Sequence, residues 1–269
     1  MIGEVIGNYR VVALLGEGGM GVVYRAEHVQ LGKQVALKVV QPALSADPMM
    51  VQRFFTEARA ASSIDHPGIV EVNDFGTHAD GRAYLVMTLL RGENLEERLE
   101  RGPLPVTEAI TILAQAAAAL AAAHDRGIIH RDLKPDNIFL VPNEMMPSGT
   151  QVVLLDFGIA KLTTERSSNC TQVGALIGTP AYMSPEQCTG RADLDHRTDL
   201  YCLGCILFHA LCGRPPFVSD QGTGVMVAAH MLDRPPTPSS IEPCVPSAVE
   251  AIVMQLLEKD PAERFQTAN

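Results

Sequence analysis

Residues 130–137 read His130-Arg131-Asp132-Leu133-Lys134-Pro135-Asp136-Asn137, and this octapeptide is the most informative stretch of the chain. Working outward from it, Asp156-Phe157-Gly158 follows on the C-terminal side, directly after an apolar run. On the N-terminal side lie a Gly-rich stretch at 16–21 and a lysine, Lys38, at the end of an apolar run. A glycine cluster alone is a weak signal because it occurs in ordinary turns. Four motifs in this order indicate one functional site.

The octapeptide carries the groups that phosphoryl transfer requires. Asp132 can accept the proton of an attacking hydroxyl, and Lys134 can neutralise the moving phosphoryl group. Asn137 and Asp156 each offer an oxygen ligand, which suits a hard cation that is held by few protein ligands and shared with phosphates. The predicted metal site is therefore Asn137 with Asp156, and the predicted ion is Mg²⁺, with Mn²⁺ as a substitute.

The Gly-rich stretch is predicted to contact the phosphates of ATP. Gly16, Gly18 and Gly21 lie between two strand patterns, where a hairpin backbone without Cβ atoms can approach a phosphate. A dinucleotide site would need a helix directly after the glycines, and residues 22–25 form a strand pattern instead. A Walker A loop would need Lys-Ser/Thr after Gly21, and Val22-Val23 stands there. In this half of the chain the predicted nucleotide-binding residues are Leu15, Gly16, Glu17, Gly18, Gly19, Gly21, Val23, Ala36 and Lys38.

Lys38 ends the apolar strand pattern that begins at Val35, so its ammonium can reach the α- and β-phosphates. A lysine in such a strand needs an anion to hold it. Glu57 is the predicted partner, because it lies beside the apolar side of a helix expected over 48–63. Taken alone, either residue would be interpreted as an ordinary surface charge.

The remaining periodicity predicts a strand-rich first part and a helical second part. Strands are expected at 11–15, 22–26, 34–40, 69–75 and 83–89, and helices at 94–100, 106–126, 199–212, 225–232 and 247–257. The stretch 142–151 is expected to be a surface loop between two strands. The change from strand patterns to helix patterns places a domain boundary near residues 88–92.

Taken together, these motifs resemble those of the protein kinases, namely the set Gly-x-Gly-x-x-Gly-x-Val, Val-Ala-Leu-Lys, His-Arg-Asp-Leu-Lys-Pro-Asp-Asn and Asp-Phe-Gly. The resemblance covers nearly the whole chain and is greatest to bacterial Ser/Thr kinases of the eukaryotic-like (Hanks) type, as in residues 178–186. It implies a bilobal α+β fold. Residues 1–90 would form a small antiparallel β-sheet lobe with one helix, and residues 91–269 a larger, mainly helical lobe.

The resemblance implies the roles given above to the Gly-rich stretch and to Lys38, Asp132, Lys134, Asn137 and Asp156, which match those of the protein-kinase motifs. It also implies roles for further residues. Met87 is similar to a gatekeeper, and the Thr88 carbonyl and Leu90 amide to the adenine-binding hinge. Glu186 should pair with Arg264. Asp199 should brace the catalytic loop.

By the same resemblance, Lys134 and Thr179 are typical of kinases that act on Ser or Thr hydroxyls of proteins. The polar segment that follows Asp156 contains the predicted autophosphorylation sites, with Thr171 as the main one and Thr163 and Thr164 as secondary ones, and Thr179 is a further predicted regulatory residue. Arg131 is expected to pair with a phosphate on this segment. Two alternatives remain open: a pseudokinase scaffold, and a small-molecule kinase of the aminoglycoside type.

Composition limits the partners and the location. The formal net charge is −10, which argues against general affinity for nucleic acid or anionic membrane. The first residues lack the features of a signal peptide, and no uncharged apolar run reaches the roughly 18–20 residues of a membrane helix. A cytoplasmic location without membrane contact by this segment is therefore expected, with tethering to the inner membrane if a transmembrane segment follows residue 269. A homodimer through the small lobe is a further expectation from the family. Cys202 and Cys205 form a C-x-x-C inside an apolar helical pattern and are expected to be reduced core thiols.

Overall fold

The structure is a computed structural model, and it describes residues 1–19, 21–157, 180–191 and 193–269. The described chain forms two compact units, one of Met1–Asp65 with Val70–Arg91 and the other of His66–Ile69 with Gly92–Asn269. The observed division lies next to the expected boundary between residues 90 and 91. It differs in one respect, because the short segment His66–Ile69 belongs to the second unit.

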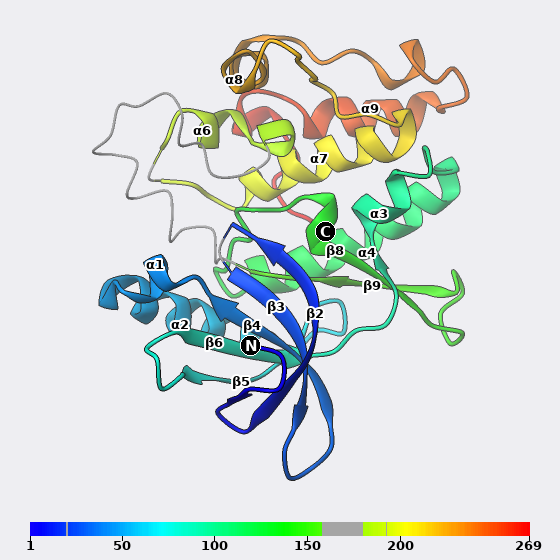
Figure 1. The fold of residues 1–269 in the computed structure, drawn as a ribbon. Coiled ribbons are helices and arrows are strands. Elements are labelled where there is room, and N and C mark those ends of the chain that lie inside the picture. Colours follow the sequence, from blue (N-terminus) through cyan, green and yellow to red (C-terminus); the bar gives the residue numbers. More distant parts are fainter. Residues whose placement is uncertain (20, 158–179, 192) are drawn as a thin grey trace. The chain divides into compact units, whose positions relative to one another are not determined.

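The first unit is built on a six-stranded antiparallel sheet with the strand order β1-β2-β3-β4-β6-β5 (Figure 1). The strands are β1 (Val5–Ile6), β2 (Tyr9–Gly18), β3 (Gly21–His28), β4 (Gln34–Val40), β5 (Val72–Thr77) and β6 (Ala83–Thr88). Strands β4 and β6 are buried along almost their whole length, which explains their continuous apolar sequences.

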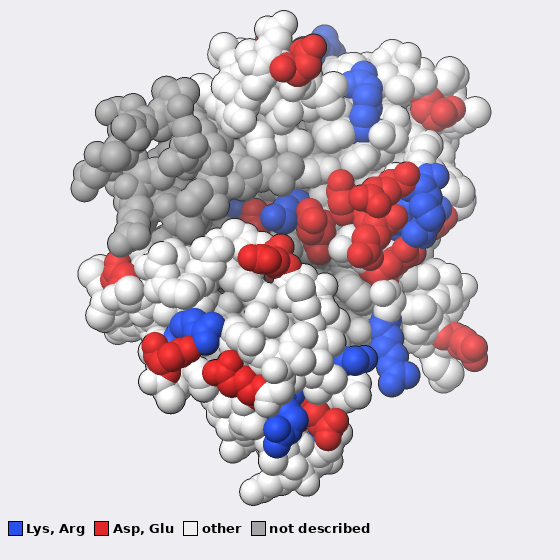
Figure 2. All heavy atoms as spheres, viewed as in Figure 1, with Lys and Arg blue, Asp and Glu red and all other residues white. Residues whose placement is uncertain are grey.

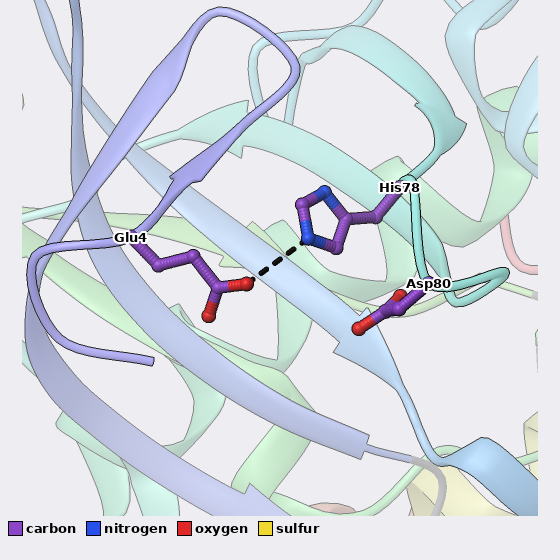
Figure 3. A group of neighbouring side chains, drawn as sticks. All are labelled: Glu4, His78 and Asp80. Carbon is purple, nitrogen blue, oxygen red and sulfur yellow. Dashed lines mark hydrogen bonds and ion pairs between the residues drawn. The ribbon is translucent and has the colours of Figure 1, made fainter.

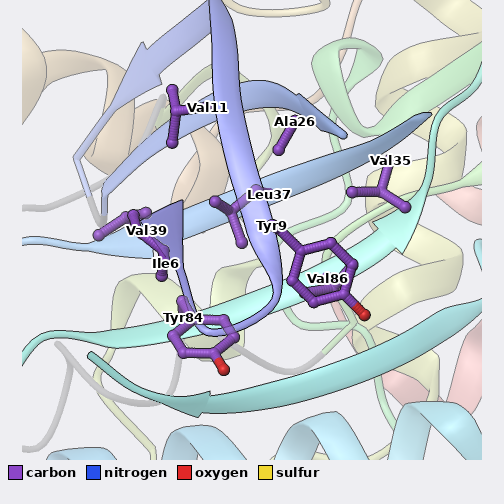
Figure 4. Close-up of a cluster of buried hydrophobic side chains, with 9 residues drawn as sticks. All are labelled: Ile6, Tyr9, Val11, Ala26, Val35, Leu37, Val39, Tyr84 and Val86. Atoms are coloured by element: carbon purple, nitrogen blue, oxygen red, sulfur yellow. The ribbon is translucent and has the colours of Figure 1, made fainter. Parts of the chain in front are cut away.

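Two helices follow β4, α1 (Pro42–Ser45) and α2 (Pro48–Ser62). Helix α2 begins after Asp47, whose carboxylate accepts a hydrogen bond from the amide of Met49 at 3.0 Å. It packs against β5 with its buried residues Met50, Phe54 and Ala58. A second apolar cluster lies within the sheet itself (Figure 4) and consists of Ile6, Tyr9, Val11, Ala26, Val35, Leu37, Val39, Tyr84 and Val86.

The strand predicted over 69–75 is wrong at its start. β5 begins at Val72, whereas Ile69 forms an isolated parallel bridge with Leu154. The amide of Leu154 also donates to the carbonyl of Gly68 at 2.8 Å. The apolar residues on either side of residue 70 thus belong to two different sheets. A local apolar pattern cannot show this difference.

The second unit is mainly helical. Its helices are α3 (Leu95–Leu99), α4 (Val106–His124), α6 (Pro185–Cys188), α7 (Arg197–Cys212), α8 (Thr223–Leu232) and α9 (Ser247–Leu256). Its small antiparallel sheet has the order β7-β8-β9, made of β7 (Glu93–Asn94), β8 (Ile138–Pro142) and β9 (Thr150–Leu154). Short 3₁₀ helices lie at Pro135–Asn137, Pro180–Tyr182, Pro238–Ser240 and Pro261–Glu263. The loop expected at 142–151 is shorter than predicted, because β8 includes Pro142 and β9 begins at Thr150.

Helix α7 forms the centre of this unit and is buried on nearly all sides, between α4 and α9. Gly204 permits the close approach of α9, since a Cβ at this position would lie 2.6 Å from the Cβ of Leu256. Cys202 and Cys205 lie on α7 and are buried, and burial raises the pKa of both thiols. Both are free thiols, as the sequence predicts.

Helix α4 is, among the described helices, the one that is long and apolar enough to cross a membrane by length and composition. Thr111 and Gln115 interrupt the apolar run of this helix, so counting consecutive apolar residues in the sequence does not predict this property. In the structure α4 packs against α7 and β9. Its buried residues are Ala109, Ile112, Leu113, Ala116, Ala119, Leu120, Ala121 and Ala123, as in the core helix of a folded domain.

Candidate active site

One buried carboxylate holds the backbone of the loop at 130–137 through hydrogen bonds. Asp199, near the start of α7, accepts hydrogen bonds from the backbone amides of His130 at 2.8 Å and Arg131 at 2.9 Å. Its side chain is fully shielded from solvent and also lies 2.8 Å from Nε2 of His124. The expectation that Asp199 braces this loop is confirmed.

Asp132 is held between an amide and an ammonium group. Nδ2 of Asn137 donates to the backbone carbonyl of Asp132 at 2.7 Å and lies 3.4 Å from its Oδ2. Nζ of Lys134 lies 3.5 Å from the same Oδ2. The Asp132 side chain keeps 32% of its surface exposed, so the carboxylate is both positioned and accessible. A positioned and accessible carboxylate of this kind is suited to accept a proton from a hydroxyl group.

Asp156 is tied to the same loop through its neighbour Leu155. The amide of Leu155 donates to the carbonyl of Asn137 at 2.9 Å, and its carbonyl lies 2.8 Å from Nε2 of His130. The ring of His130 packs against Phe157 with the centroids 4.7 Å apart. These contacts fix the backbone on both sides of Asp156 relative to Asn137.

Two residues of this site have left-handed backbone conformations, Arg131 with φ of 64° and Asp156 with φ of 56°. For residues other than glycine such conformations cost about 1–3 kcal/mol and persist where the surroundings enforce them. The carbonyl of Arg131 accepts a hydrogen bond from Nε2 of Gln187 at 2.6 Å, and its amide is held by Asp199. The sequence contains no signal for Gln187, which links the catalytic loop to α6.

One nitrogen of the Arg131 guanidinium lacks a hydrogen bond within the described part of the chain. Its Nε is shielded from solvent and has no hydrogen-bond partner among the described residues. A buried guanidinium nitrogen of this kind normally has an acceptor. The arrangement is suited to an anion next to the catalytic loop.

Helix α6 is held in place by a buried ion pair. Glu186 pairs bidentately with Arg264, with Oε1–Nη1 and Oε2–Nη2 distances of 2.7 and 2.9 Å, and Oε1 also accepts from the hydroxyl of Thr198. Burial by itself would raise the pKa of Glu186, but Arg264 and then Thr198 hold the pKa below its ordinary value. The predicted pairing of Glu186 with Arg264 is confirmed.

In the first unit the glycines of the β2–β3 hairpin differ from one another. Among the described residues, no heavy atom lies within 4 Å of a Cβ built on Gly16 or Gly18. A Cβ on Gly21, by contrast, would lie 2.2 Å from the carbonyl oxygen of Val39 on β4. Gly21 is therefore required by strand packing, whereas Gly16 and Gly18 leave a space that a ligand can fill.

The other predicted nucleotide-binding residues of this unit lie on or next to the sheet. Lys38 is 6% exposed on β4, opposite Val23 of β3. Met87 on β6 pairs with Ala36 of β4, and both are buried. Leu15, Glu17 and Gly19 are exposed in the hairpin region. Thr88 donates its amide to the carbonyl of Glu71 at 3.0 Å, and Leu90 follows two residues later.

Glu57 lies on α2, and its Oε2 is shielded from solvent. Its predicted pairing with Lys38 stays a prediction. Gly158 and the predicted regulatory residues lie outside the described residues, namely Thr163, Thr164, Thr171 and Thr179.

Comparison with known proteins is consistent with this geometry. The family model for the protein kinase domain matches residues 9–269. This chain belongs to the protein kinase family. Its fold is the protein kinase fold, with an antiparallel sheet in one unit and helices in the other.

Bacterial kinases are among the proteins that this chain resembles. The chain is 44% identical over 265 residues to the serine/threonine-protein kinase Pkn1 of Myxococcus xanthus, covering 98% of this chain and 37% of that protein. It is 38% identical over 268 residues to PknH of Mycobacterium tuberculosis (strain H37Rv), covering 99% of this chain and 41% of that protein. The crystal structure of the M. tuberculosis PknI kinase domain aligns with a TM-score of 0.76 at 30% identity, covering 100% of this chain and 95% of that one. The chain thus spans less than half the length of these two curated relatives.

Proposed function

We propose that this chain is an active Ser/Thr protein kinase that transfers the γ-phosphate of ATP to hydroxyls of protein substrates. The observation that carries the proposal is the carboxylate of Asp132, which is accessible, flanked by Lys134 and Asn137, and mounted on a loop that Asp199 anchors. Membership of the family and the names of the bacterial relatives support the same activity.

Asp132 acts on the acceptor hydroxyl. Its carboxylate orients the Ser or Thr side chain and takes the hydroxyl proton as the oxygen attacks the γ-phosphorus. The new P–O bond forms while the bond from the γ-phosphorus to the β–γ bridging oxygen breaks, and ADP leaves with that oxygen. Lys134 stabilises the negative charge on the transferring group, because its ammonium already lies beside Asp132.

The oxygen ligands of the second unit fit a hard divalent cation. Because Nδ2 of Asn137 is engaged by Asp132, its amide oxygen is the atom that it can offer to a metal. Asp156 contributes a carboxylate from the neighbouring backbone. Bound Mg²⁺ supplies charge neutralisation at the phosphates, and all-oxygen ligation suits Mg²⁺ or Mn²⁺.

The nucleotide-binding role of the first unit rests on the hairpin and on β4. The open space at Gly16 and Gly18 suits phosphate groups approached by backbone amides. Lys38 contributes an ammonium group for the α- and β-phosphates, with Glu57 as its partner. Met87, Thr88 and Leu90 bind the adenine side by the family resemblance.

Autophosphorylation is the proposed means of regulation. Thr171 is the main site and Thr163 and Thr164 are secondary ones. The guanidinium of Arg131, whose Nε lacks a partner among the described residues, is the group that would pair with the phosphate. Replacing Thr171 by Ala should therefore lower activity toward a protein substrate, and mass-spectrometric mapping that finds Thr171 unmodified on fully active enzyme would contradict this assignment.

Protein substrates suit the charge of the molecule better than nucleic acid. On the face shown in Figure 2, acidic side chains gather over α3, whose segment carries Glu93, Glu96, Glu97 and Glu100. A nucleic-acid-binding surface would show the opposite charge.

The decisive experiment follows labelled γ-phosphate from Mg-ATP onto the chain itself and onto myelin basic protein, with an aminoglycoside as a competing acceptor class. We expect label on Ser and Thr of both proteins. Label on the aminoglycoside alone would favour the small-molecule kinase, and nucleotide binding without any transfer would favour the pseudokinase.

A further inference from the structure

Glu4, His78 and Asp80 bring two carboxylates and an imidazole together in the first unit, and none of the three takes part in the proposed phosphoryl transfer. One ligand atom from each residue lies within 4.8 Å of those of the other two. Nε2 of His78 lies 3.0 Å from Oε1 of Glu4. Figure 3 shows the three side chains converging from two segments, one just before β1 and the other at the β5–β6 turn.

Backbone hydrogen bonds hold both segments in place. Beside Glu4, the amide of Gly3 donates to the carbonyl of Val11, and the amide of Val11 donates to the carbonyl of Glu4, both at 2.9 Å. In the β5–β6 turn, the amide of His78 donates to the carbonyl of Arg82 at 2.8 Å. The three side chains therefore project from a frame that exists without a ligand, which lowers the cost of ordering a site.

The charges of the cluster favour a cation. Nε of Arg82 donates to the Asp80 carboxylate at 2.7 Å, and Nη2 of Arg82 donates to the same oxygen. Both side-chain hydrogen bonds of Arg82 go to Oδ2 of Asp80, while Oδ1, within the described part of the chain, accepts the backbone amide of Arg82 at 3.1 Å. The two carboxylates of Glu4 and Asp80 thus outnumber the one guanidinium, that of Arg82, beside the imidazole of His78.

We propose that Glu4, His78 and Asp80 bind one Zn²⁺ ion. Bonds of about 2.0–2.2 Å place the ligands of a tetrahedral zinc roughly 3.4 Å apart, so the cluster needs only small side-chain rotations to close around the ion. An imidazole together with carboxylates suits Zn²⁺ rather than Mg²⁺ or Ca²⁺. Water completes the fourth position of this exposed site.

The bound ion replaces the hydrogen bond between His78 and Glu4. Nε2 of His78 then faces the metal, and the neutral imidazole carries its proton on Nδ1. The ion joins the segment before β1 to the β5–β6 turn. Zinc therefore acts as a cross-link within this unit and takes no part in phosphoryl transfer.

The test titrates the chain, free of nucleotide and previously treated with chelator, with ZnCl₂ in a calorimeter. We expect one site in the wild type and affinity at least about tenfold weaker in His78→Ala and in Asp80→Asn, since loss of even an outer-shell partner typically weakens metal binding about 10–100-fold. Glu27→Gln removes an exposed carboxylate from β3 of the same unit and should bind like the wild type. Equal affinity in the wild type and both ligand variants would overturn the proposal.

Two further readouts separate this site from the cysteines and from Asp156. A Co²⁺ complex of the wild type should show d–d absorption that is lost in His78→Ala and should lack a thiolate-to-metal charge-transfer band. Zn²⁺ should also slow hydrogen exchange of the amides of residues 3–6 in the wild type and leave it unchanged in His78→Ala. Each variant is first shown to unfold at the wild-type urea concentration in chelator, and Glu4→Gln replaces any variant that does not. A thiolate band that persists in all variants, with no effect on residues 3–6, would place the metal at cysteines and refute the site.

Discussion

The catalytic loop and the Gly-rich hairpin are held in place by different means. The loop at 130–137 is fixed by side chains from distant parts of the sequence, above all Asp199 and Gln187. The hairpin at 16–21 is held by its own strand pairing, which is irregular between Leu14 and Gly16. Proton transfer depends on one carboxylate in one position, whereas phosphate can be bound by a row of backbone amides. The difference indicates that the loop should be sensitive to every removed contact and the hairpin only to changes that block its space.

The largest expected effect comes from Asp132→Asn. Loss of a positioned base should lower kcat by about 10²–10⁴, or roughly 3–5 kcal/mol of barrier, and leave the KM for ATP nearly unchanged. Gly18→Ala in the hairpin should do the reverse, raising the KM for ATP more than it lowers kcat, because its new Cβ occupies the open space. Steady-state kinetics on a protein substrate measure both.

Asp125→Asn serves as the charge-matched control for Asp132→Asn, since Asp125 is exposed beyond the end of α4. It should keep wild-type kinetics. If Asp132→Asn retains more than about a tenth of wild-type turnover, Asp132 is not the base and the proposed mechanism fails.

A loss of stability is expected from Asp199→Asn. The amide oxygen can accept from only one of the backbone amides of His130 and Arg131, and its NH2 group would face the other, so a buried donor is left unsatisfied at a cost of about 1–3 kcal/mol. Urea unfolding measures the loss, and kcat should fall with it because the loop is no longer anchored.

Asp195→Asn is the matched control for Asp199→Asn. Asp195 pairs with Arg197 at the surface, with 45% of its side chain exposed, so this change should cost at most about 1 kcal/mol. Equal losses in the two variants would mean that the buried anchor has no special role.

The fold and the main residues of the site could be predicted from the sequence, because each motif combines local secondary structure with a chemical requirement. Asp132 and Asn137 are in one loop, and Asp199 and Arg264 follow from the family resemblance. Gln187 could not be predicted, because its bond to the carbonyl of Arg131 joins residues far apart in sequence with no pattern in either.

Local patterns also failed where one apolar stretch serves two units. Ile69 and Val72 read as one strand, yet Ile69 bridges to Leu154 and Val72 begins β5. The sequence likewise does not show why position 21 requires glycine. The restricting contact comes from the carbonyl of Val39 on the neighbouring strand.

Gly21→Ala and Gly18→Ala are expected to differ in stability, although both lie in the same hairpin. Its Cβ would meet a backbone carbonyl oxygen at 2.2 Å, which must force β3 and β4 apart, and overpacking of this kind costs about 1–3 kcal/mol. Gly18→Ala meets no atom of the described chain within 4 Å and should change stability by less than about 0.5 kcal/mol. Urea unfolding of both variants without nucleotide checks this difference, and equal stabilities would show that Gly21 is not constrained by β4.

The smallest expected effect is the contribution of Glu186 to the pH dependence of stability. It tests whether the ion pair with Arg264, which holds α6, stabilises the fold. Because the pKa of Glu186 is lowered in the folded chain, its ionised form adds stability above the ordinary carboxyl value of 4.5. This contribution is lost as the pH falls from there toward the lowered folded value. The difference in unfolding free energy between wild type and Glu186→Gln should therefore shrink between pH 7 and the acid limit of folding.

Gln255→Ala, at an exposed position of α9, provides the baseline for that measurement, because it neither adds nor removes an ionisable group and its difference from the wild type should stay constant over the same range. Urea unfolding at several pH values from neutral down to the acid limit of folding yields both curves. A Glu186→Gln curve parallel to that of the wild type would mean that the carboxylate gains nothing from Arg264 on folding. The bidentate pair would then position α6 without stabilising it, as buried ion pairs can do when desolvation offsets their attraction.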